Sequence, residues 1–333
     1  MIALNARAAT RPELGGVERW ARELVRRLPE LGDYEVIRPP AQLVHRAGHA
    51  WEQIVLPFKA RGARLLLNPA NLAPVAFPRN AVIIHDAAAL RRPEWYSPMY
   101  VAWQRAVLPA VAKRARLVIT VSEFSRQEVR ELLGVDAHVV PGGVDERFRP
   151  DADPEPARAA LNLHRPYVLT VASRTARKNL AALDAAARRL ATHGIDLVAA
   201  GGGRPQFEGE ATGARPLGHV PDEHLPGLYV GAKAFVLPSW HEGFGLTCLE
   251  AMACGTPVVA ARAGALPETC GDAARYADPF DQHDIAEQVE AALDDQALRQ
   301  AGPHHARQFT WDRTARAIDA LMRSPPPRAS GRP

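Results

Sequence analysis

Twelve short apolar runs, separated by segments with helical spacing, constrain the fold of this chain more than any other feature. Six runs lie in the first half, at residues 2–5, 34–37, 64–67, 81–85, 117–121 and 138–140. Six more lie in the second half, at residues 167–172, 195–200, 215–217, 234–237, 257–260 and 274–277. Strands that alternate with helices form parallel sheets covered on both faces. We therefore expect an α/β protein with two doubly wound, Rossmann-like domains, although periodicity alone leaves a barrel open.

A length of 333 residues also favours two domains over one. Residues 148–156 are rich in proline and acid and poor in apolar side chains, as a linker would be. We expect an N-terminal domain over 1–150 and a second domain over 151–308. A helix over 309–323 follows, and the proline-rich residues 324–333 form a disordered tail.

Composition predicts a cytoplasmic protein. No apolar segment is long enough to span a bilayer, and the N-terminal residues lack the pattern of a signal peptide. The three cysteines, Cys248, Cys254 and Cys270, have no metal-binding spacing. We interpret them as reduced packing residues.

Positive charge is concentrated in the first half of the chain. Residues 1–150 carry 22 Lys plus Arg against 15 Asp plus Glu, and the remaining residues carry 19 against 22. This basic half would suit an anionic partner, such as the inner face of a membrane or a lipid phosphate. A generic arginine-rich surface is the alternative. Aromatic residues do not interleave with the basic ones, which disfavours nucleic-acid binding.

The segment 238–255, PSWHEGFGLTCLEAMACG, contains two carboxylates, Glu242 and Glu250, on either side of a glycine turn. The turn leads from an apolar run into a helical pattern, so free backbone N–H groups would point at a bound anion. The two carboxylates could accept hydrogen bonds from hydroxyl groups on both sides of a diphosphate, as in a nucleotide-sugar. Solvated charges near a helix end are the simpler alternative. The turn and first helical residues are Gly243, Phe244, Gly245, Leu246 and Thr247.

A second candidate lies at residues 171–180, where Arg174, Arg177 and Lys178 follow an apolar run and precede a predicted helix. Three cations within five residues would neutralise a diphosphate leaving group. A solvated basic turn is the alternative.

Three further features lie where strands are expected to end. A glycine triplet begins with Gly201 and Gly202, and Gly15 and Gly16 precede a helix predicted over 20–28. His85 ends its apolar run, at the edge of the sheet where sites gather in open α/β folds. Each feature also has a simpler interpretation: the glycine triplet as a tight turn, Gly15 and Gly16 as an ordinary strand-to-helix loop, and His85 as a structural histidine.

These motifs resemble the retaining glycosyltransferases of family 4, which have the GT-B architecture. The strings EGFGL, LEAMA and CGTPVV carry the match, together with RKN at 177–179 and GGVER at 15–19. The string IIHDAAALRRPEWYS is similar to the mannosyltransferase-like branch. The resemblance spans roughly residues 2–320 and implies that the last helix crosses back to the first domain, which would bind the acceptor.

The resemblance also implies roles for the candidate residues. Arg174, Arg177, Lys178 and the turn amides would stabilise the departing diphosphate. Glu250 would bind the ribose, whereas Glu242 and His85 would bind the transferred sugar. The nucleotide cleft would be completed by Gly15, Gly16, Gly201, Gly202, His219 and Val220. Many relatives have a cation where this chain has Ser173, so the arginine assignment is open.

The donor implied by the branch is GDP-mannose, with UDP-sugars next, and no metal or other cofactor is implied. The acceptor would be a lipid-linked saccharide, a polysaccharide or a small-molecule glycoside. A nucleotide-sugar epimerase, a sugar phosphorylase and a silent sugar-nucleotide-binding subunit are the rival functions. A nicotinamide-dependent dehydrogenase is disfavoured, because the glycine triplet is not GxGxxG.

Overall fold

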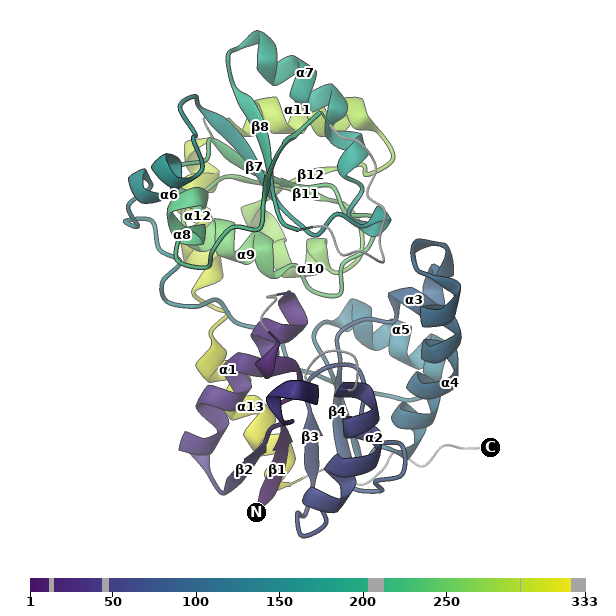
Figure 1. Ribbon diagram of the computed structural model, residues 1–333. Coiled ribbons are helices and arrows are strands. Elements are labelled where there is room, and N and C mark those ends of the chain that lie inside the picture. Colours follow the sequence, from purple (N-terminus) through teal and green to yellow (C-terminus); the bar gives the residue numbers. More distant parts are fainter. Residues whose placement is uncertain (12–14, 44–47, 203–212, 294, 325–333) are drawn as a thin grey trace. The chain divides into compact units, whose positions relative to one another are not determined.

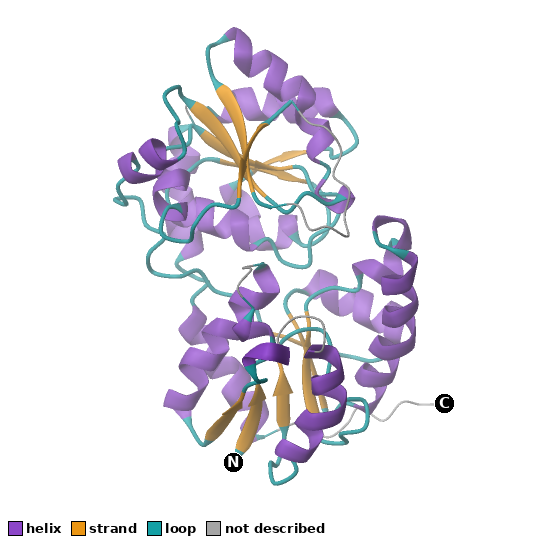
Figure 2. Ribbon diagram, viewed as in Figure 1, coloured by secondary structure: helices purple, strands orange, loops and turns teal. Residues whose placement is uncertain are grey.

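The computed structural model describes residues 1–333 except 12–14, 44–47, 203–212, 294 and 325–333. Gly203 and almost all of the predicted tail therefore lie outside the described residues. The chain divides into two compact units (Figure 1). Unit 1 comprises Met1–Gly143 and Thr310–Pro333, and unit 2 comprises Val144–Phe309. Each unit is an α/β structure with its own parallel sheet (Figure 2).

The sheet of unit 1 has the strand order β2-β1-β3-β4-β5-β6, and all pairs are parallel. Its central strands are buried apolar runs, which is the composition expected when helices cover both faces. The strands are β1 (Ile2–Asn5), β2 (Tyr34–Ile37), β3 (Leu66–Asn68), β4 (Asn80–Ile84), β5 (Leu117–Thr120) and β6 (His138–Val139).

Helices of unit 1 come from both ends of the chain. The last helix packs against α1, where the rings of Trp20 and Trp311 meet edge to face at 5.3 Å. Arg27 and Asp312 form an ion pair along the same contact. The helices are α1 (Gly16–Leu31), α2 (Gly48–Lys59), α3 (Ala88–Arg91), α4 (Pro98–Arg114), α5 (Glu123–Leu133) and α13 (Trp311–Arg323).

Unit 2 has a second six-stranded parallel sheet, in the order β12-β11-β10-β7-β8-β9. Its strands are β7 (Tyr167–Val171), β8 (Asp196–Ala200), β9 (Arg215–Gly218), β10 (Ala234–Leu237), β11 (Val258–Ala261) and β12 (Arg275–Ala277). Its helices are α6 (Glu155–Ala160), α7 (Asp184–Thr192), α8 (Leu225–Val230), α9 (Leu246–Ala253), α10 (Leu266–Cys270), α11 (Gln282–Ala292) and α12 (Gln296–Ala306).

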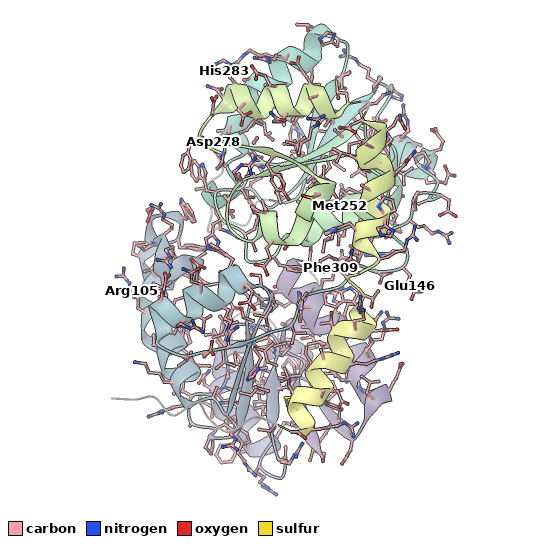
Figure 3. The ribbon with its side chains drawn as sticks, turned by 180° about the vertical axis from the view of Figure 1, so that it is seen from behind. Arg105, Glu146, Met252, Asp278, His283 and Phe309 are labelled. Carbon is pink, nitrogen blue, oxygen red and sulfur yellow. The ribbon has the colours of Figure 1, made fainter. Side chains whose placement is uncertain are left out.

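Helix α12 packs against α9, where the backbone of Gly302 approaches Met252 so closely that a Cβ would lie 3.1 Å from its carbonyl oxygen. Figure 3 shows Met252 and, at the end of unit 2, Phe309 from behind.

All twelve predicted apolar runs are strands, and the two separate sheets exclude the barrel. The three cysteines, all within the described part of the chain, are buried and form no disulfide.

Two predictions about helix starts are wrong. Helix α1 begins at Gly16 rather than residue 20, because the Glu18 carboxylate accepts a hydrogen bond from the Gly15 N–H (3.2 Å) and caps the helix early. The segment after β7 forms two short 3-10 turns, and helix α7 begins only at Asp184.

Candidate functional site

Unit 2 has a topological switch point between β7 and β10, because the chain progresses from β7 in one direction and from β10 in the other. Ligands of open α/β sheets bind outside the carboxyl ends of strands at such a point. The two main candidate motifs follow these two strands. The Lys178 Nζ donates to the Glu242 Oε1 at 2.5 Å, and an Arg177 Nη1 lies 3.4 Å from the other carboxylate oxygen. The structure thus brings residues 64 positions apart into one cluster.

The loop after β7 is fixed by its own side chains. Asn179 has the left-handed conformation (φ 53°), and its amide group donates to the carbonyl oxygens of Pro238 (3.0 Å) and Pro279 (2.8 Å). Arg177 donates to the His241 carbonyl oxygen at 3.0 Å and accepts from the Trp240 N–H at 3.1 Å through its own carbonyl. These contacts explain why the cations do not continue into a helix.

Electrostatics at this cluster favour a bound anion. Burial raises the pKa of Glu242, but the charges of Lys178 and Arg177 outweigh burial and bring that pKa down to about 2. Burial lowers the pKa of Lys178, and this effect exceeds the opposing influence of Glu242. We read the pair as ionised, since the carboxylate is held in its charged form by two cations. Two cations, Lys178 and Arg177, thus face a single carboxylate, and a ligand phosphate would add further negative charge beside them.

The glycine turn after β10 forms the N-terminus of α9. Gly245 has φ 108°, which a side chain would strain, and a Cβ there would lie 2.7 Å from the Leu266 Cδ2. The first N–H groups of a helix have no intrahelical partner, so those of Leu246 and Thr247 are available as donors. Phe244 is buried and meets the Phe309 ring edge-on at 6.0 Å.

Gly264, which follows β11 and packs against the backbone of Glu242, could not be predicted as part of the site. A Cβ at Gly264 would lie 2.6 Å from the Glu242 backbone nitrogen, and its φ is 59°. A lone glycine in a loop gave no signal of this contact.

Glu250 lies on α9 and is buried, with only 4% of its surface exposed. The Tyr229 hydroxyl, on α8, donates to the Glu250 Oε2 at 3.0 Å. Tyr229 could not be predicted from the sequence either, because it belongs to an apolar helix and precedes Glu250 by 21 positions. This hydrogen bond fixes the orientation of the carboxylate.

The predicted glycines after β8 lie directly beside the loop after β7. A Cβ at Gly201 would be 2.0 Å from the Ala172 carbonyl oxygen, and its φ of 134° is reserved for glycine. The Arg174 N–H reaches the Gly202 carbonyl at 3.5 Å, so Ser173 and Arg174 line the same edge. His219 is exposed and Val220 is buried; both follow β9 at this edge.

In unit 1, His85 follows β4 and is 93% buried by its neighbours, with 7% exposed. Its Nε2 lies 2.7 Å from the Pro69 carbonyl oxygen, and its ring packs edge-on against Trp20 at 5.3 Å. Burial lowers the pKa of His85 despite the opposing carboxylates of Asp86 and Glu18. The histidine is therefore a neutral hydrogen-bonding group at neutral pH.

The turn at Gly15 and Gly16 follows β1 and opens α1, on the same edge of the unit 1 sheet as His85. Glu18 caps this turn and also pairs with Arg11 at 3.3 Å. The Gly15–Gly16 turn and His85 thus belong to unit 1, and the cationic loop and the glutamates belong to unit 2.

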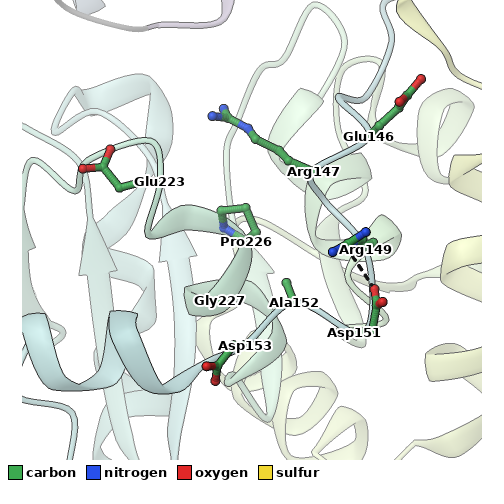
Figure 4. Close-up of a pocket in the computed structure, with 9 residues that line it drawn as sticks. All are labelled: Glu146, Arg147, Arg149, Asp151, Ala152, Asp153, Glu223, Pro226 and Gly227. Atoms are coloured by element: carbon green, nitrogen blue, oxygen red, sulfur yellow. Dashed lines mark ion pairs between the residues drawn. The ribbon is translucent and has the colours of Figure 1, made fainter.

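A pocket of about 600 Å³ lies elsewhere in unit 2 (Figure 4). Its two arginines are paired with carboxylates, Arg147 with Asp222 (2.9 Å) and Arg149 with Asp151 (3.2 Å). None of the predicted site residues lines it, and its excess of acidic side chains does not suit a phosphate. The lining residues are Glu146, Arg147, Arg149, Asp151, Ala152, Asp153, Glu223, Pro226 and Gly227.

Within the described residues, no group of three or more His, Cys, Asp or Glu side chains is placed to hold a metal ion. In the same part of the chain, no helix has the length and apolar character needed to cross a bilayer.

Two parallel α/β sheets, one with a cationic loop at its topological switch point, place the protein in the class of nucleotide-binding α/β folds. Comparisons with known proteins narrow this class. Residues 151–309 match "Glycosyl transferases group 1", and residues 76–148 match "Glycosyltransferase Family 4". The chain belongs to glycosyltransferase family 4, and its fold is GT-B.

Relatives are similar over most of their lengths. The chain is 33% identical over 273 residues to O-antigen chain mannosyltransferase B of Escherichia coli, covering 74% of this chain and 71% of the relative. It is 32% identical to D-inositol 3-phosphate glycosyltransferase 1 of Catenulispora acidiphila, covering 91% and 75%.

Solved structures share the fold at low sequence identity. Sucrose-phosphate synthase from Thermosynechococcus elongatus superimposes with a TM-score of 0.77 at 21% identity, over 97% of this chain and 98% of that one. Anabaena HepE in complex with UDP and glucose gives 0.72 at 18% identity, over 97% and 99%.

Proposed function

We propose that this glycosyltransferase moves mannose from GDP-mannose to a saccharide, lipid-linked or small-molecule glycoside acceptor, with retention of the anomeric configuration. The Lys178–Glu242 pair at the β7/β10 switch point carries the proposal, because it places cations, backbone donors and a carboxylate at one edge of unit 2. Similarity to relatives that are mannosyltransferases, O-antigen chain mannosyltransferase B and MMP alpha-(1->4)-mannosyltransferase, supports mannose as the transferred sugar.

The cations bind the diphosphate of the donor. Lys178, Arg177 and Arg174 neutralise the charge that develops on the leaving phosphate, and the amides of Leu246 and Thr247 donate hydrogen bonds to it. These side chains supply the positive charge that a divalent metal supplies in other transferases. The departing nucleoside diphosphate is thus stabilised by fixed groups that need no rearrangement during the reaction.

The carboxylates bind hydroxyl groups on either side of the diphosphate. Glu250, held by Tyr229, accepts hydrogen bonds from the ribose. Glu242 is ionised and buried, so it accepts strong hydrogen bonds from hydroxyls of the transferred sugar. Neutral His85, from unit 1, contributes a further hydrogen bond to that sugar. The glycines and His219 and Val220 border the nucleotide, and unit 1 binds the acceptor.

Retention follows from attack on the same face that the leaving group departs from. The bond between the sugar C1 and the phosphate oxygen breaks, and the acceptor oxygen forms a new bond to C1. The leaving phosphate takes the acceptor proton. Exclusion of water protects the donor from hydrolysis during this step.

A UDP-sugar donor is the second candidate, since a solved structure of the same fold is a complex with UDP and glucose. Thermal-shift screening against GDP, UDP, ADP and dTDP sugars separates the two, because a ligand of the folded form raises its apparent stability. We expect GDP-mannose to give the largest shift. A larger shift with a UDP-sugar would identify that sugar nucleotide as the donor instead. No shift with any of the four classes would contradict the donor site.

Two further measurements test the reaction itself. Nuclear magnetic resonance of the product would show the same anomeric configuration as the donor if the enzyme is retaining, and an inverted product would contradict the mechanism. Release of nucleoside diphosphate only when an acceptor is present would separate a transferase from an epimerase.

A further inference from the structure

Exposed apolar side chains of this protein are concentrated on two helices of unit 1. Among the described residues, eight large hydrophobic side chains are exposed, and six of them lie on α2 and α4. The most exposed of the six are Met99 (83%), Phe58 (69%) and Ile54 (63%). The other three are Val55, Tyr100 and Trp103.

Exposed apolar side chains form a stripe on the outer surface of each helix. On α4, Ala102 and Ala106 continue the exposed stripe of Met99 and Trp103 at helical spacing, and residues 98–114 contain no acidic side chain. A helix that is apolar on its exposed face as well as its buried face is not explained by packing within its own unit.

Helix α2 shows the same pattern. Ala50, Ile54 and Phe58 are exposed at intervals of four residues, and its one acidic side chain, Glu52, is buried at 1% exposure. Glu52 is occupied inside the unit, where it pairs with Arg7 at 3.1 Å.

The two helices lie on the same side of the sheet. The connections from β2 to β3 and from β4 to β5 progress in the same direction along the sheet, and right-handed crossovers therefore place α2 and α4 on one face (Figure 1). The rings of His49 on α2 and Trp103 on α4 approach to 6.2 Å. We call this surface the α2–α4 face; it comprises Ala50, Ile54, Val55, Phe58, Met99, Ala102, Trp103 and Ala106.

Basic side chains flank this face. Lys59 and Arg61 follow the apolar stripe of α2, and Arg105 and Lys113 lie on the exposed surface of α4; Figure 3 labels Arg105. Helices with an apolar face and flanking Lys and Arg lie in the interface of anionic bilayers. A two-fold contact with a second copy would place these like charges together, which disfavours self-association.

We propose that the α2–α4 face inserts into the headgroup region of an anionic bilayer and holds unit 1 on the membrane surface. Phe58, Ile54, Met99 and Trp103 enter the interface, and the flanking cations contact lipid phosphates. This attachment is independent of the identity of the sugar donor. It explains why, in the part of the chain that the structure describes, the exposed apolar side chains gather on helices of unit 1 and not on those of unit 2.

Vesicle co-sedimentation of the full-length protein tests the proposal. We expect it to bind vesicles of phosphatidylcholine with about a third phosphatidylglycerol, and to bind pure phosphatidylcholine much more weakly. The quadruple variant I54S/F58S/M99S/W103S should lose roughly tenfold or more of this binding. The matched control is Phe280→Ser, which removes a side chain of unit 2 that is 81% exposed and should leave binding unchanged.

Thermal shift with GDP-mannose and with UDP-glucose is measured in parallel on both variants. An unchanged shift shows that the quadruple variant is folded and separates this proposal from the donor assignment. Binding of the wild type to neither vesicle, or equal binding of the wild type and the quadruple variant, would overturn the proposal. A wild type that dimerises in light scattering, with a monomeric quadruple variant and no vesicle binding, would assign the face to a second copy.

Discussion

Lys178 is the residue whose removal should affect catalysis most. It is the cation nearest Glu242, and loss of one preorganised charge-stabilising group typically lowers turnover roughly a hundredfold or more. We predict such a loss for Lys178→Ala in an assay of nucleoside diphosphate release, with partial rescue in Lys178→Arg. Lys233→Ala is the control, because Lys233 immediately precedes β10 at the opposite edge of the same sheet. Near-normal turnover of Lys178→Ala would remove this residue from the mechanism.

Tyr229 should affect donor binding without affecting the chemical step. Tyr229→Phe removes the hydroxyl that donates to Glu250. Without this hydrogen bond the buried carboxylate is less firmly oriented, so its proposed hydrogen bonds to the ribose become weaker. We expect the dissociation constant for the nucleotide, measured by calorimetry, to rise about threefold to tenfold.

Tyr167→Phe is the matched control for that variant. Its hydroxyl donates at 2.8 Å to the backbone carbonyl of Leu228, so its loss should change stability and leave affinity alone. Equal affinities for the wild type and Tyr229→Phe would refute the role of Tyr229.

Glu242 should make the stability of unit 2 depend on pH. Its pKa in the folded protein is about 2, below the ordinary value of 4.5, so the unfolded state takes up its proton first as the pH falls. The stabilisation is complete above pH 4.5 and is lost as the pH falls from 4.5 towards 2; its upper bound is about 3 kcal/mol. Urea unfolding between pH 6 and 3 should therefore show a steeper decline for the wild type than for Glu242→Gln. Parallel pH profiles of the two proteins would contradict the ionised pair.

Among the structural elements, the loops after β7 and β8 depend on one glycine. Gly201→Ala would place a Cβ 2.0 Å from the Ala172 carbonyl oxygen at φ 134°, so we expect a loss of roughly 2 kcal/mol or more in the free energy of unfolding and weaker nucleotide binding. Gly202→Ala is the adjacent control, because a Cβ there meets nothing within 4 Å. Similar melting temperatures for the two variants would show that the loop adapts.

Strands of this protein can be predicted from the sequence better than helix starts. Buried parallel strands are continuous apolar runs, and β4 (NAVII) or β10 (AFVL) can be read directly. The apolar pattern predicts too late a start for α1, because the capping carboxylate of Glu18 sets where this helix begins. The helix predicted after the cationic loop begins only at Asp184, because Asn179 is held by hydrogen bonds to Pro238 and Pro279, which are contacts between distant segments.

In the molecule as a whole, candidate residues that stand in recurring motifs can be proposed from the sequence, whereas the residues that hold them in place cannot. Glu242, Glu250 and Lys178 stand in recognisable strings, so their chemistry could be proposed from the sequence. Tyr229 and Gly264 act through the fold, which places them beside residues far along the chain. The α2–α4 face was not predicted either, because exposure of Met99 or Phe58 depends on which helix face the sheet covers.

Unit 2 should bind the donor without unit 1. It is one continuous segment, Val144–Phe309, with its own sheet, and the Lys178–Glu242 and Tyr229–Glu250 pairs lie within it. We expect residues 144–309 expressed alone to bind nucleoside diphosphate in calorimetry and to lack transferase activity. A folded unit 2 that binds no nucleotide would show that donor binding requires groups from unit 1.

The most direct test is a crystal structure of the protein with a nucleotide-diphosphate sugar. We predict density for the diphosphate at the carboxyl ends of β7 and β10, within hydrogen-bonding distance of the Lys178 Nζ and the amides at the start of α9, and the ribose against Glu250. Diphosphate bound elsewhere, for example in the pocket between Arg147 and Glu223, would contradict the proposed donor site.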